Sequence, residues 1–265
     1  MVASSSPDPA RLPGADAAPT RRVSVVVPVL NEQDNLDTLI QEIHAALEGR
    51  EAFEIVYVDD GSTDETLMRL EALQRSGAPL RIVRHTQCCG QSASLASGIR
   101  AAAGTIVITL DGDGQNDPAD IPALLRRFGE ELSQTPADLL LVAGHRSQRK
   151  DTWIKRVSSR IANAVRARLL RDATADTGCG LKVFTRAAFM DMPRFDHMHR
   201  FLPALMLRRG GRVVSVAVNH RPRAKGRSKY GTLDRLAVGI VDLFGVMWLM
   251  RRGKIPEIID RPKDR

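Results

Sequence analysis

Residues 105–115 read TIVITLDGDGQ, a short β-branched run that leads directly into a turn with two aspartates. An apolar run of this length is typical of a buried strand in a parallel sheet. Asp111 and Asp113 follow it with one glycine between them, and glycine permits the tight turn that lets both carboxylates face one hard cation. This stretch therefore predicts an α/β sheet with an acidic loop at the end of a strand.

Runs of the same kind recur along the chain. Further strands are predicted at 23–27, 54–58, 81–83 and 138–144. Helix-length segments lie between the runs, at 34–48, 64–75, 91–103 and 119–131. This alternation predicts a doubly wound, mostly parallel sheet. Ligands of such sheets bind beyond the carboxyl ends of the strands, so we expect the chemistry in the loops that follow the strands.

These loops lack two common phosphate-binding motifs. The first strand continues as PVLNE at 28–32 without a G-x-G-x-x-G pattern, and G-x-x-x-x-G-K-[ST] occurs nowhere in the chain, which disfavours a dehydrogenase and a P-loop NTPase. The second strand continues as VDDGSTD at 58–64. Its carboxylates, Asp59 and Asp60, can accept hydrogen bonds from a nucleoside, although the same string also reads as a turn followed by a helix N-cap.

The acidic loop DGDGQ at 111–115 suits a metal-held diphosphate. Mg²⁺ or Mn²⁺ bound by few protein ligands keeps coordination positions open and stabilises the charge on a departing nucleotide diphosphate. Two other interpretations compete with this one. The first is an incomplete calcium loop, which lacks the glutamate at its last position, and the second is a plain turn closed by Asp117-Pro118.

The composition suits one catalytic domain with appendages, because the chain has 265 residues of which 43% are apolar. Residues 1–21 are rich in Ala, Ser, Pro and Asp and lack the apolar core of a signal peptide, so we expect a disordered leader and a cytoplasmic protein. The cysteines, Cys88, Cys89 and Cys179, show no zinc-binding spacing, and structural disulfides are not expected.

The net charge of +8 is unevenly distributed. Residues 145–171 and 194–229 together carry +17, which leaves −9 for the rest of the chain. This division fits a protein that holds a metal in its acidic part and binds an anionic partner with its basic part. The alternative is that the basic segments are helices whose charged faces are only solvated. Nucleic acid is not expected as the partner, because only 4% of residues are aromatic and no nucleic-acid module is recognisable.

Two segments bear on membrane association. A helix at about 153–170 would be basic and amphipathic, which favours either a membrane surface or packing on the sheet. Residues 236–250, LAVGIVDLFGVMWLM, contain a single charged residue, Asp242. As a helix they would extend about 22 Å, short of the roughly 30 Å hydrocarbon core. They therefore predict an interfacial or re-entrant anchor, with a protein interface such as a dimer contact as the alternative.

The strings PVLNE, VDDGSTD and DGDGQ, in this order and spacing, resemble glycosyltransferase family 2, and within it the polyprenyl-phosphate sugar synthases such as dolichyl-phosphate mannose synthase. Two further motifs complete the likeness, KRxxSRxxN at 155–163 and RxxGxSKY at 223–230. The likeness covers roughly residues 22–231 and implies a GT-A domain there. A membrane-interfacial helix and a basic tail are then expected at 232–265.

The resemblance implies an inverting, metal-dependent hexosyltransferase with Mg²⁺ or Mn²⁺ as cofactor. It would move a sugar from a UDP- or GDP-sugar to a polyprenyl phosphate, supplying a lipid-linked sugar for cell-envelope glycan or lipopolysaccharide modification. The enzyme would attach peripherally to the cytoplasmic face of the inner membrane, and a homo-oligomer is compatible with this.

The resemblance also implies residue roles. The catalytic residues would be Asp111, Asp113, Gln115 and Asp176, of which Asp111 and Asp113 hold the metal. The nucleotide sugar would bind at Pro28, Asn31, Glu32, Asp59, Asp60, Arg146, Arg223 and Lys229. The lipid phosphate would bind at Lys155, Ser159, Arg160 and Ser228.

A phosphate acceptor changes what the enzyme must supply. The second ionisation of a phosphate monoester lies near pH ~6, so the acceptor phosphate is largely dianionic at neutral pH and is already nucleophilic. A strong base is therefore not needed. Arg221 and Arg223 would screen the leaving group. One alternative is a family 2 enzyme with a glycan hydroxyl as acceptor, which needs a base such as Asp176. The other is a membrane-associated binding protein without catalysis.

Overall fold

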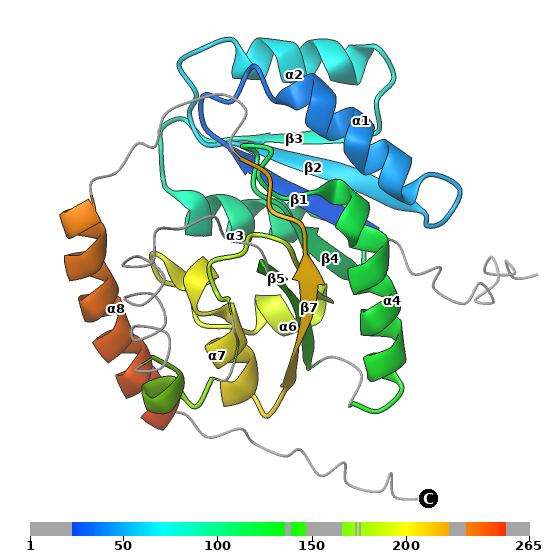
Figure 1. The fold of residues 1–265 in the computed structure, drawn as a ribbon. Helices are drawn as coiled ribbons and strands as arrows, with labels where there is room; N and C mark the ends of the chain where they lie inside the picture. Colours follow the sequence, from blue (N-terminus) through cyan, green and yellow to red (C-terminus); the bar gives the residue numbers. More distant parts are fainter. Residues whose placement is uncertain are drawn as a thin grey trace, which may run out of the picture.

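The computed structural model describes residues 23–135, 139–146, 166–172, 174, 176–222 and 232–252, with the backbone alone for 232–237. These residues form a seven-stranded sheet with helices on both faces (Figure 1). The strands lie in the order β3-β2-β1-β4-β6-β5-β7. Their bounds are Val23–Val29 (β1), Phe53–Asp59 (β2), Leu80–Arg84 (β3), Ile106–Thr109 (β4), Leu140–Arg146 (β5), Lys182–Thr185 (β6) and Arg212–Val218 (β7).

Strand β6 runs against both of its neighbours. It pairs with β4 and β5 in antiparallel fashion, whereas β1 pairs with β2 and β4, β2 with β3, and β5 with β7 in parallel. The predicted mostly parallel sheet is therefore confirmed. Because β6 lies between β4 and β5, the loop after β4 and the segment that leads into β6 meet at one edge of the sheet.

Helices cover each face of the sheet, as expected for a doubly wound fold. One face carries α1 (Leu36–Leu47), α2 (Thr66–Arg75) and α4 (Ile121–Leu132), and the other carries α3 (Gln91–Ala101), α6 (Arg186–Met190) and α7 (Leu202–Arg208). Strand β1 shows how the sequence builds two cores. Val25 and Val27 join the core with α1, whereas Val26 joins the core with α3, because successive side chains of a strand point to opposite faces.

Some elements differ from the prediction. Helices α1 to α4 lie where the sequence predicts them, with a short 3₁₀ turn, η1 (Pro118–Asp120), before α4. The sequence pattern does not indicate β6, which has four residues and begins with the charged Lys182, or the short α6. It also misses β7, α7 and the 3₁₀ turn η2 (Met198–Arg200). Of the helix expected at 153–170, the structure describes only the helical residues 166–170.

Helix α8 (Thr232–Arg251) packs along α7 at one side of the molecule (Figure 1). Val246 is fully buried in the core on the α3 face, and Arg208 of α7 donates to the carbonyl of Leu249 at 3.0 Å. On the outer side Phe244 and Trp248 are exposed by 64% and 62%. In the part of the chain that is described, none of the helices combines the length and the apolar character needed to cross a bilayer.

Candidate active site

The loops that follow β1 and β2 are joined to each other by hydrogen bonds. Asn31 adopts a left-handed backbone (φ 53°), which turns the chain at the end of β1. Its backbone N–H donates to Ser62 Oγ at 2.9 Å, and its side-chain oxygen accepts from the N–H of Thr63 at 2.8 Å. The N–H of Glu32 donates to Thr66 Oγ1 at 2.9 Å. The PVLNE and VDDGSTD segments therefore form one structural unit.

Asp59 and Asp60 lie at the end of β2 and are both buried. Asp59 Oδ1 accepts from the N–H of Ser62 at 3.0 Å. Asp60 is held by the loop before α3, since Oδ1 accepts from the N–H of Cys89 at 2.9 Å and Oδ2 from the N–H of Gly90 at 2.8 Å. Burial raises the pKa of Asp60, but these bonds and that to His85 outweigh it and lower the pKa, so the carboxyl stays ionised.

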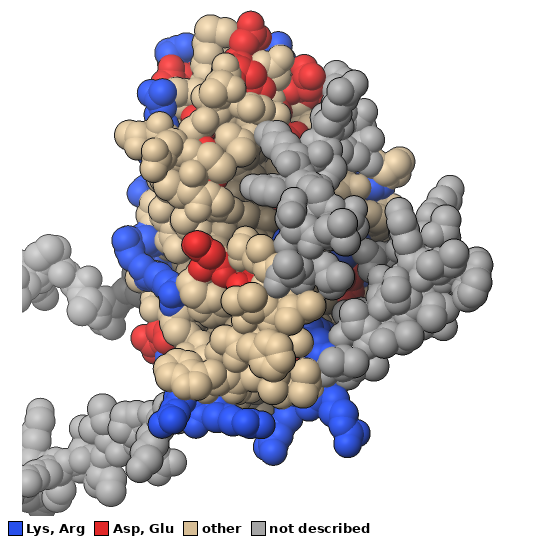
Figure 2. Space-filling view, turned by 90° about the vertical axis from the view of Figure 1, so that its left-hand side faces the viewer, with Lys and Arg blue, Asp and Glu red and all other residues tan. Residues whose placement is uncertain are grey.

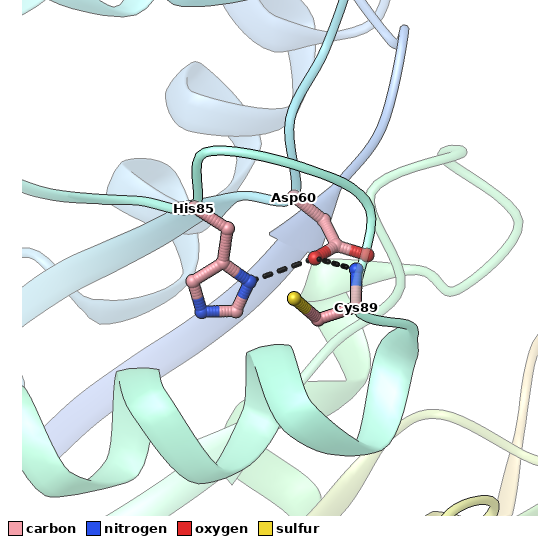
Figure 3. A group of neighbouring side chains, drawn as sticks. All are labelled: Asp60, His85 and Cys89. Carbon is pink, nitrogen blue, oxygen red and sulfur yellow. Dashed lines mark hydrogen bonds and ion pairs between the residues drawn. The ribbon is translucent and has the colours of Figure 1, made fainter.

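His85 completes the support of Asp60 (Figure 3). Its Nδ1 lies 2.7 Å from Asp60 Oδ1, and its Nε2 lies 2.9 Å from Ser97 Oγ on α3. Ligand atoms of Asp60, His85 and Cys89 all lie within 4.8 Å of one another, as in a metal site. However, the carboxylate oxygens already accept hydrogen bonds from the surrounding loop. We therefore interpret the group as a network that orients Asp60.

The acidic loop after β4 lies against the loop after β1. A side chain at Gly112 would come within 2.5 Å of Val29 and 2.9 Å of the Pro28 carbonyl oxygen, so only glycine allows this approach. Asp113 Oδ1 accepts from the N–H of Gln115 at 3.1 Å. The fold thus brings the DGDGQ loop beside the loops that carry Asp59 and Asp60, as the sequence predicts for strand ends.

Asp111 lies between the start of α3 and the segment that leads into β6. Gln91 Nε2, at the start of α3, donates to its Oδ1 at 2.8 Å. On the other side lies Gly180, where any side chain would overlap the Asp111 carboxylate. Burial and the charge of Asp113 raise the pKa of Asp111, and Lys182 opposes this only in part. A divalent cation would relieve this repulsion, so the pair fits a hard cation bound through carboxylate oxygens.

Arg146 and Asp176 form a buried ion pair. Arg146 Nε lies 2.6 Å from Asp176 Oδ2, and Nη2 lies 2.8 Å from Oδ1, a bidentate arrangement. The N–H of Gly178 donates to the same carboxylate at 3.2 Å. The family resemblance implies that Arg146 binds the nucleotide sugar and that Asp176 is catalytic; the structure places the two against each other, next to the segment that flanks Asp111.

Other predicted site residues are placed differently. Arg221 pairs with Glu42 at 2.7 Å and with Asp117 at 2.6 Å, so its charge is compensated within the protein. Six residues lie outside the described part of the chain: Lys155, Ser159, Arg160, Arg223, Ser228 and Lys229. Their roles stay predictions.

A cavity of about 500 Å³ opens beside Asp111. It extends from the start of α3 to α8, and its lining includes Gln91, Asp111, Lys182, His199, Arg200 and Val238. Lys182 Nζ donates to the carbonyl oxygen of Cys179 and is almost fully buried. The pKa of this ammonium is lowered, because burial outweighs the nearby Cys179 and Asp111, which raise it. The sequence analysis does not identify Gln91, Lys182 or His199, because no motif marks them.

The sequence pattern described as Glycosyl transferase family 2 matches residues 24–192, which include both acidic loops and Asp176. The chain belongs to this family. The predicted family is thereby confirmed, and the chain is a glycosyltransferase.

Relatives of this family 2 glycosyltransferase are similar over most of its length. Dodecaprenyl-phosphate galacturonate synthase of Rhizobium johnstonii is 36% identical over 241 residues, which make up 89% of this chain and 69% of the relative. Undecaprenyl-phosphate 4-deoxy-4-formamido-L-arabinose transferase of Edwardsiella ictaluri is 35% identical over 213 residues, 80% of this chain and 63% of the relative. The chain spans about two thirds of the length of these relatives.

Solved structures confirm the predicted GT-A fold. Glucosyl-3-phosphoglycerate synthase from Mycobacterium tuberculosis, in complex with Mg²⁺ and UDP, superposes with a TM-score of 0.63 and 20% identity over 87% of this chain and 79% of that chain. Its complex with Mn²⁺, UDP-glucose and phosphoglyceric acid gives a TM-score of 0.61 and 21% identity over the same shares.

Proposed function

We propose that this glycosyltransferase moves a sugar from a nucleotide-sugar donor to a polyprenyl phosphate. The observation that carries the proposal is the packing of Gly112 on Pro28 and Val29, because it brings the Asp111/Asp113 loop, our proposed cation site, close to the strand ends that carry the proposed nucleoside site. The names of both relatives contain a polyprenyl phosphate, and those relatives match 80–89% of this chain.

The donor would bind across the loops after β1, β2 and β4. Asp59 and Asp60 would accept hydrogen bonds from the nucleoside, with Pro28, Asn31 and Glu32 shaping the adjacent wall. Of the two, Asp59 has an oxygen, Oδ2, without a hydrogen-bond partner among the described residues, whereas four groups of one loop already bind the Asp60 carboxylate and fix the end of β2 before the nucleoside arrives.

Asp111 and Asp113 would hold Mg²⁺ or Mn²⁺. The bound cation would act as a Lewis acid that stabilises the nucleotide diphosphate as it leaves. Gln91 would keep the Asp111 carboxylate oriented toward the diphosphate through the bond of 2.8 Å to Oδ1. Gln115 adjoins this site, since its N–H donates to Asp113.

The state of Asp176 favours a phosphate acceptor over a hydroxyl acceptor. An alcohol needs a base to remove its proton, and a carboxylate bound bidentately by an arginine is a weak base. Asp176 is bound in this way by Arg146. A phosphate monoester needs no base: its oxygen attacks the anomeric carbon, the bond to the diphosphate breaks with its electron pair, and the configuration inverts.

Helix α8 and the basic segments would attach the enzyme to an anionic bilayer. Figure 2 shows this side of the molecule, where mostly uncharged residues with a small acidic group among them cover the middle and Lys and Arg lie along the lower edge. Val241, Phe244 and Trp248 are exposed on α8, and exposed Arg251 and Arg252 follow at its end. Apolar residues that are flanked by cations suit the headgroup region. The division into a GT-A domain at 22–231 and an interfacial region at 232–265 is part of this proposal.

A screen of nucleotide sugars tests the donor half. The full chain is heated with UDP- and GDP-sugars in the presence of Mn²⁺ or of a chelator. We expect either the UDP-sugars or the GDP-sugars to raise the melting temperature of the protein, and only when Mn²⁺ is present. A ligand that binds the folded state stabilises that state by mass action. The Asp113→Ala variant should lose this shift. A shift that persists in the variant would contradict the cation site.

Sedimentation with anionic liposomes tests the membrane half. We expect a variant with Val241→Ser, Phe244→Ser and Trp248→Ser to remain in the supernatant. Met68→Ser serves as a control, since Met68 is exposed by 57% on α2. If the triple variant still sediments with the liposomes, or changes the oligomeric state of the protein instead, α8 is not the membrane contact.

A further inference from the structure

The cavity beside Asp111 contains more positive than negative charge. Arg200 and Lys182 line it together with two histidines, whereas Asp111 is the only acidic residue among its described lining residues. Lys182 is compensated, because it lies near Asp111 and donates to the Cys179 carbonyl. Arg200 makes no ion pair with any acidic side chain in the described ranges. A half-buried guanidinium in this position favours an anion.

His199 adds a neutral donor to the same wall. Ser92 Oγ accepts from the backbone N–H of His199 at 3.2 Å and lies 2.8 Å from its Nδ1. Where the hydroxyl donates its hydrogen to Nδ1, the ring hydrogen of His199 lies on Nε2. No described residue accepts from Nε2, and the ring lines the cavity. The link to Ser92 also fixes η2 against α3.

The proposed reaction and the contacts of the cavity with α8 indicate which anion this is. In the proposed reaction the diphosphate leaves on the Asp111 side, so the acceptor must approach from the opposite side of the sugar. Val238 of α8 lines the cavity, and Nδ1 of His197, the residue before η2, lies 3.0 Å from Asp242 Oδ2 on α8. The α8 end of the cavity therefore adjoins the surface that carries the exposed Val241 and Phe244.

We propose that the turn η2 forms a subsite for the phosphate of the polyprenyl acceptor, in which Arg200 pairs with the phosphate and His199 donates a hydrogen bond from Nε2. The first part of the prenyl chain leaves past Val238 along α8. This inference rests on the proposed function and adds residues that the sequence motifs do not contain. The carboxylate of an acidic donor sugar would be the competing anion.

Binding and kinetics of the full-length Arg200→Gln variant test this inference. We expect the Kd for farnesyl monophosphate to rise by about 10-fold or more, because a charge-assisted hydrogen bond contributes roughly 1.5–3 kcal/mol. The KM for the prenyl phosphate should rise by a similar factor, and the KM for the nucleotide sugar should stay unchanged. Arg200→Lys should recover part of the loss. The matched control is Arg126→Gln, an exposed arginine on α4 at the other face of the sheet.

The outcomes separate the subsite from the proposed function. If the unaltered protein does not bind farnesyl monophosphate, both the subsite and the polyprenyl acceptor are wrong. If it binds this lipid and transfers sugar to it, but Arg200→Gln leaves Kd and KM unchanged, only the subsite is wrong. A higher KM for a uronic-acid donor alone would also overturn the subsite, since it would assign Arg200 to the donor sugar.

Discussion

Arg146 binds Asp176 through two hydrogen bonds of 2.6 and 2.8 Å, and this pair lies beside the segment that encloses Asp111. Both side chains are largely buried, with exposed fractions of 14% and 9%. The pair therefore commits the Asp176 carboxylate to Arg146, and we predict a structural role for Asp176 beside Asp111.

We expect Asp176→Asn to lower the free energy of unfolding by about 3 kcal/mol, because it leaves the buried charge of Arg146 without its partner. Denaturant unfolding measures this. Asp191→Asn is the control, since Asp191 pairs with Arg209 but is 62% exposed, and a change within about 0.5 kcal/mol is expected. If Asp176→Asn leaves stability intact and removes the acidic limb of the pH–rate profile, Asp176 acts as a base after all.

Gly180→Ala should damage the cation site without unfolding the protein, because the added methyl group would overlap the Asp111 carboxylate. We expect Mn²⁺ affinity to fall by at least about 10-fold, as when a supporting group of a metal ligand is lost. Gly129→Ala in α4 is the matched control, because a side chain there meets nothing within 4 Å. It should stabilise the helix by about 0.5–1 kcal/mol. Equal Mn²⁺ affinity in both variants would argue against Asp111 as a ligand.

His85→Ala should raise the KM for the nucleotide sugar by roughly 10-fold and change kcat less, because Asp60 loses a charge-assisted hydrogen bond that orients it. Steady-state kinetics separates the two constants. Cys88→Ser is the control, since a serine hydroxyl can replace the weak contact of 3.4 Å from Cys88 Sγ to Asp60. A lower kcat with an unchanged KM would show that His85 serves the chemical step and not donor binding.

His199 makes stability depend on acid pH. Burial, with Lys182 and Arg200 nearby, lowers its pKa from 6.5 to about 3. Between these values the unfolded chain binds a proton that the folded protein does not, so stability falls as the pH drops below about 6.5. We expect His199→Gln to flatten this part of the curve of melting temperature against pH. An unchanged slope would mean that the ring is protonated in the folded protein.

The sequence predicts the part of the fold from β1 to α4 well, because local patterns determine it. The β-branched runs mark β1, β2 and β4, and glycine and aspartate mark the turns that follow them. Parallel strands end at one edge, so Asp59 and Asp111 had to come close together. Family resemblance supplies the roles that geometry alone leaves open.

The cavity side was harder to predict, since it depends on contacts between distant segments. Strand β6 reverses direction and brings Gly180 onto Asp111 across 69 positions of sequence. His199 reaches Ser92 across 107 positions. Neither contact leaves a periodic signal. Lys182 opens a buried strand, although charged residues normally argue against one, because its ammonium finds a carbonyl and a carboxylate at the site.

Formation of a lipid-linked sugar tests the central claim most directly. The full-length protein is incubated with radiolabelled nucleotide sugars, undecaprenyl phosphate and Mn²⁺, and label in the organic-soluble lipid fraction is measured. We expect label to appear with one donor class, to vanish with a chelator, and to fall at least about 100-fold in Asp113→Ala. Label that appears on a soluble glycan and never on the lipid, or undiminished transfer by Asp113→Ala, would contradict the proposed function.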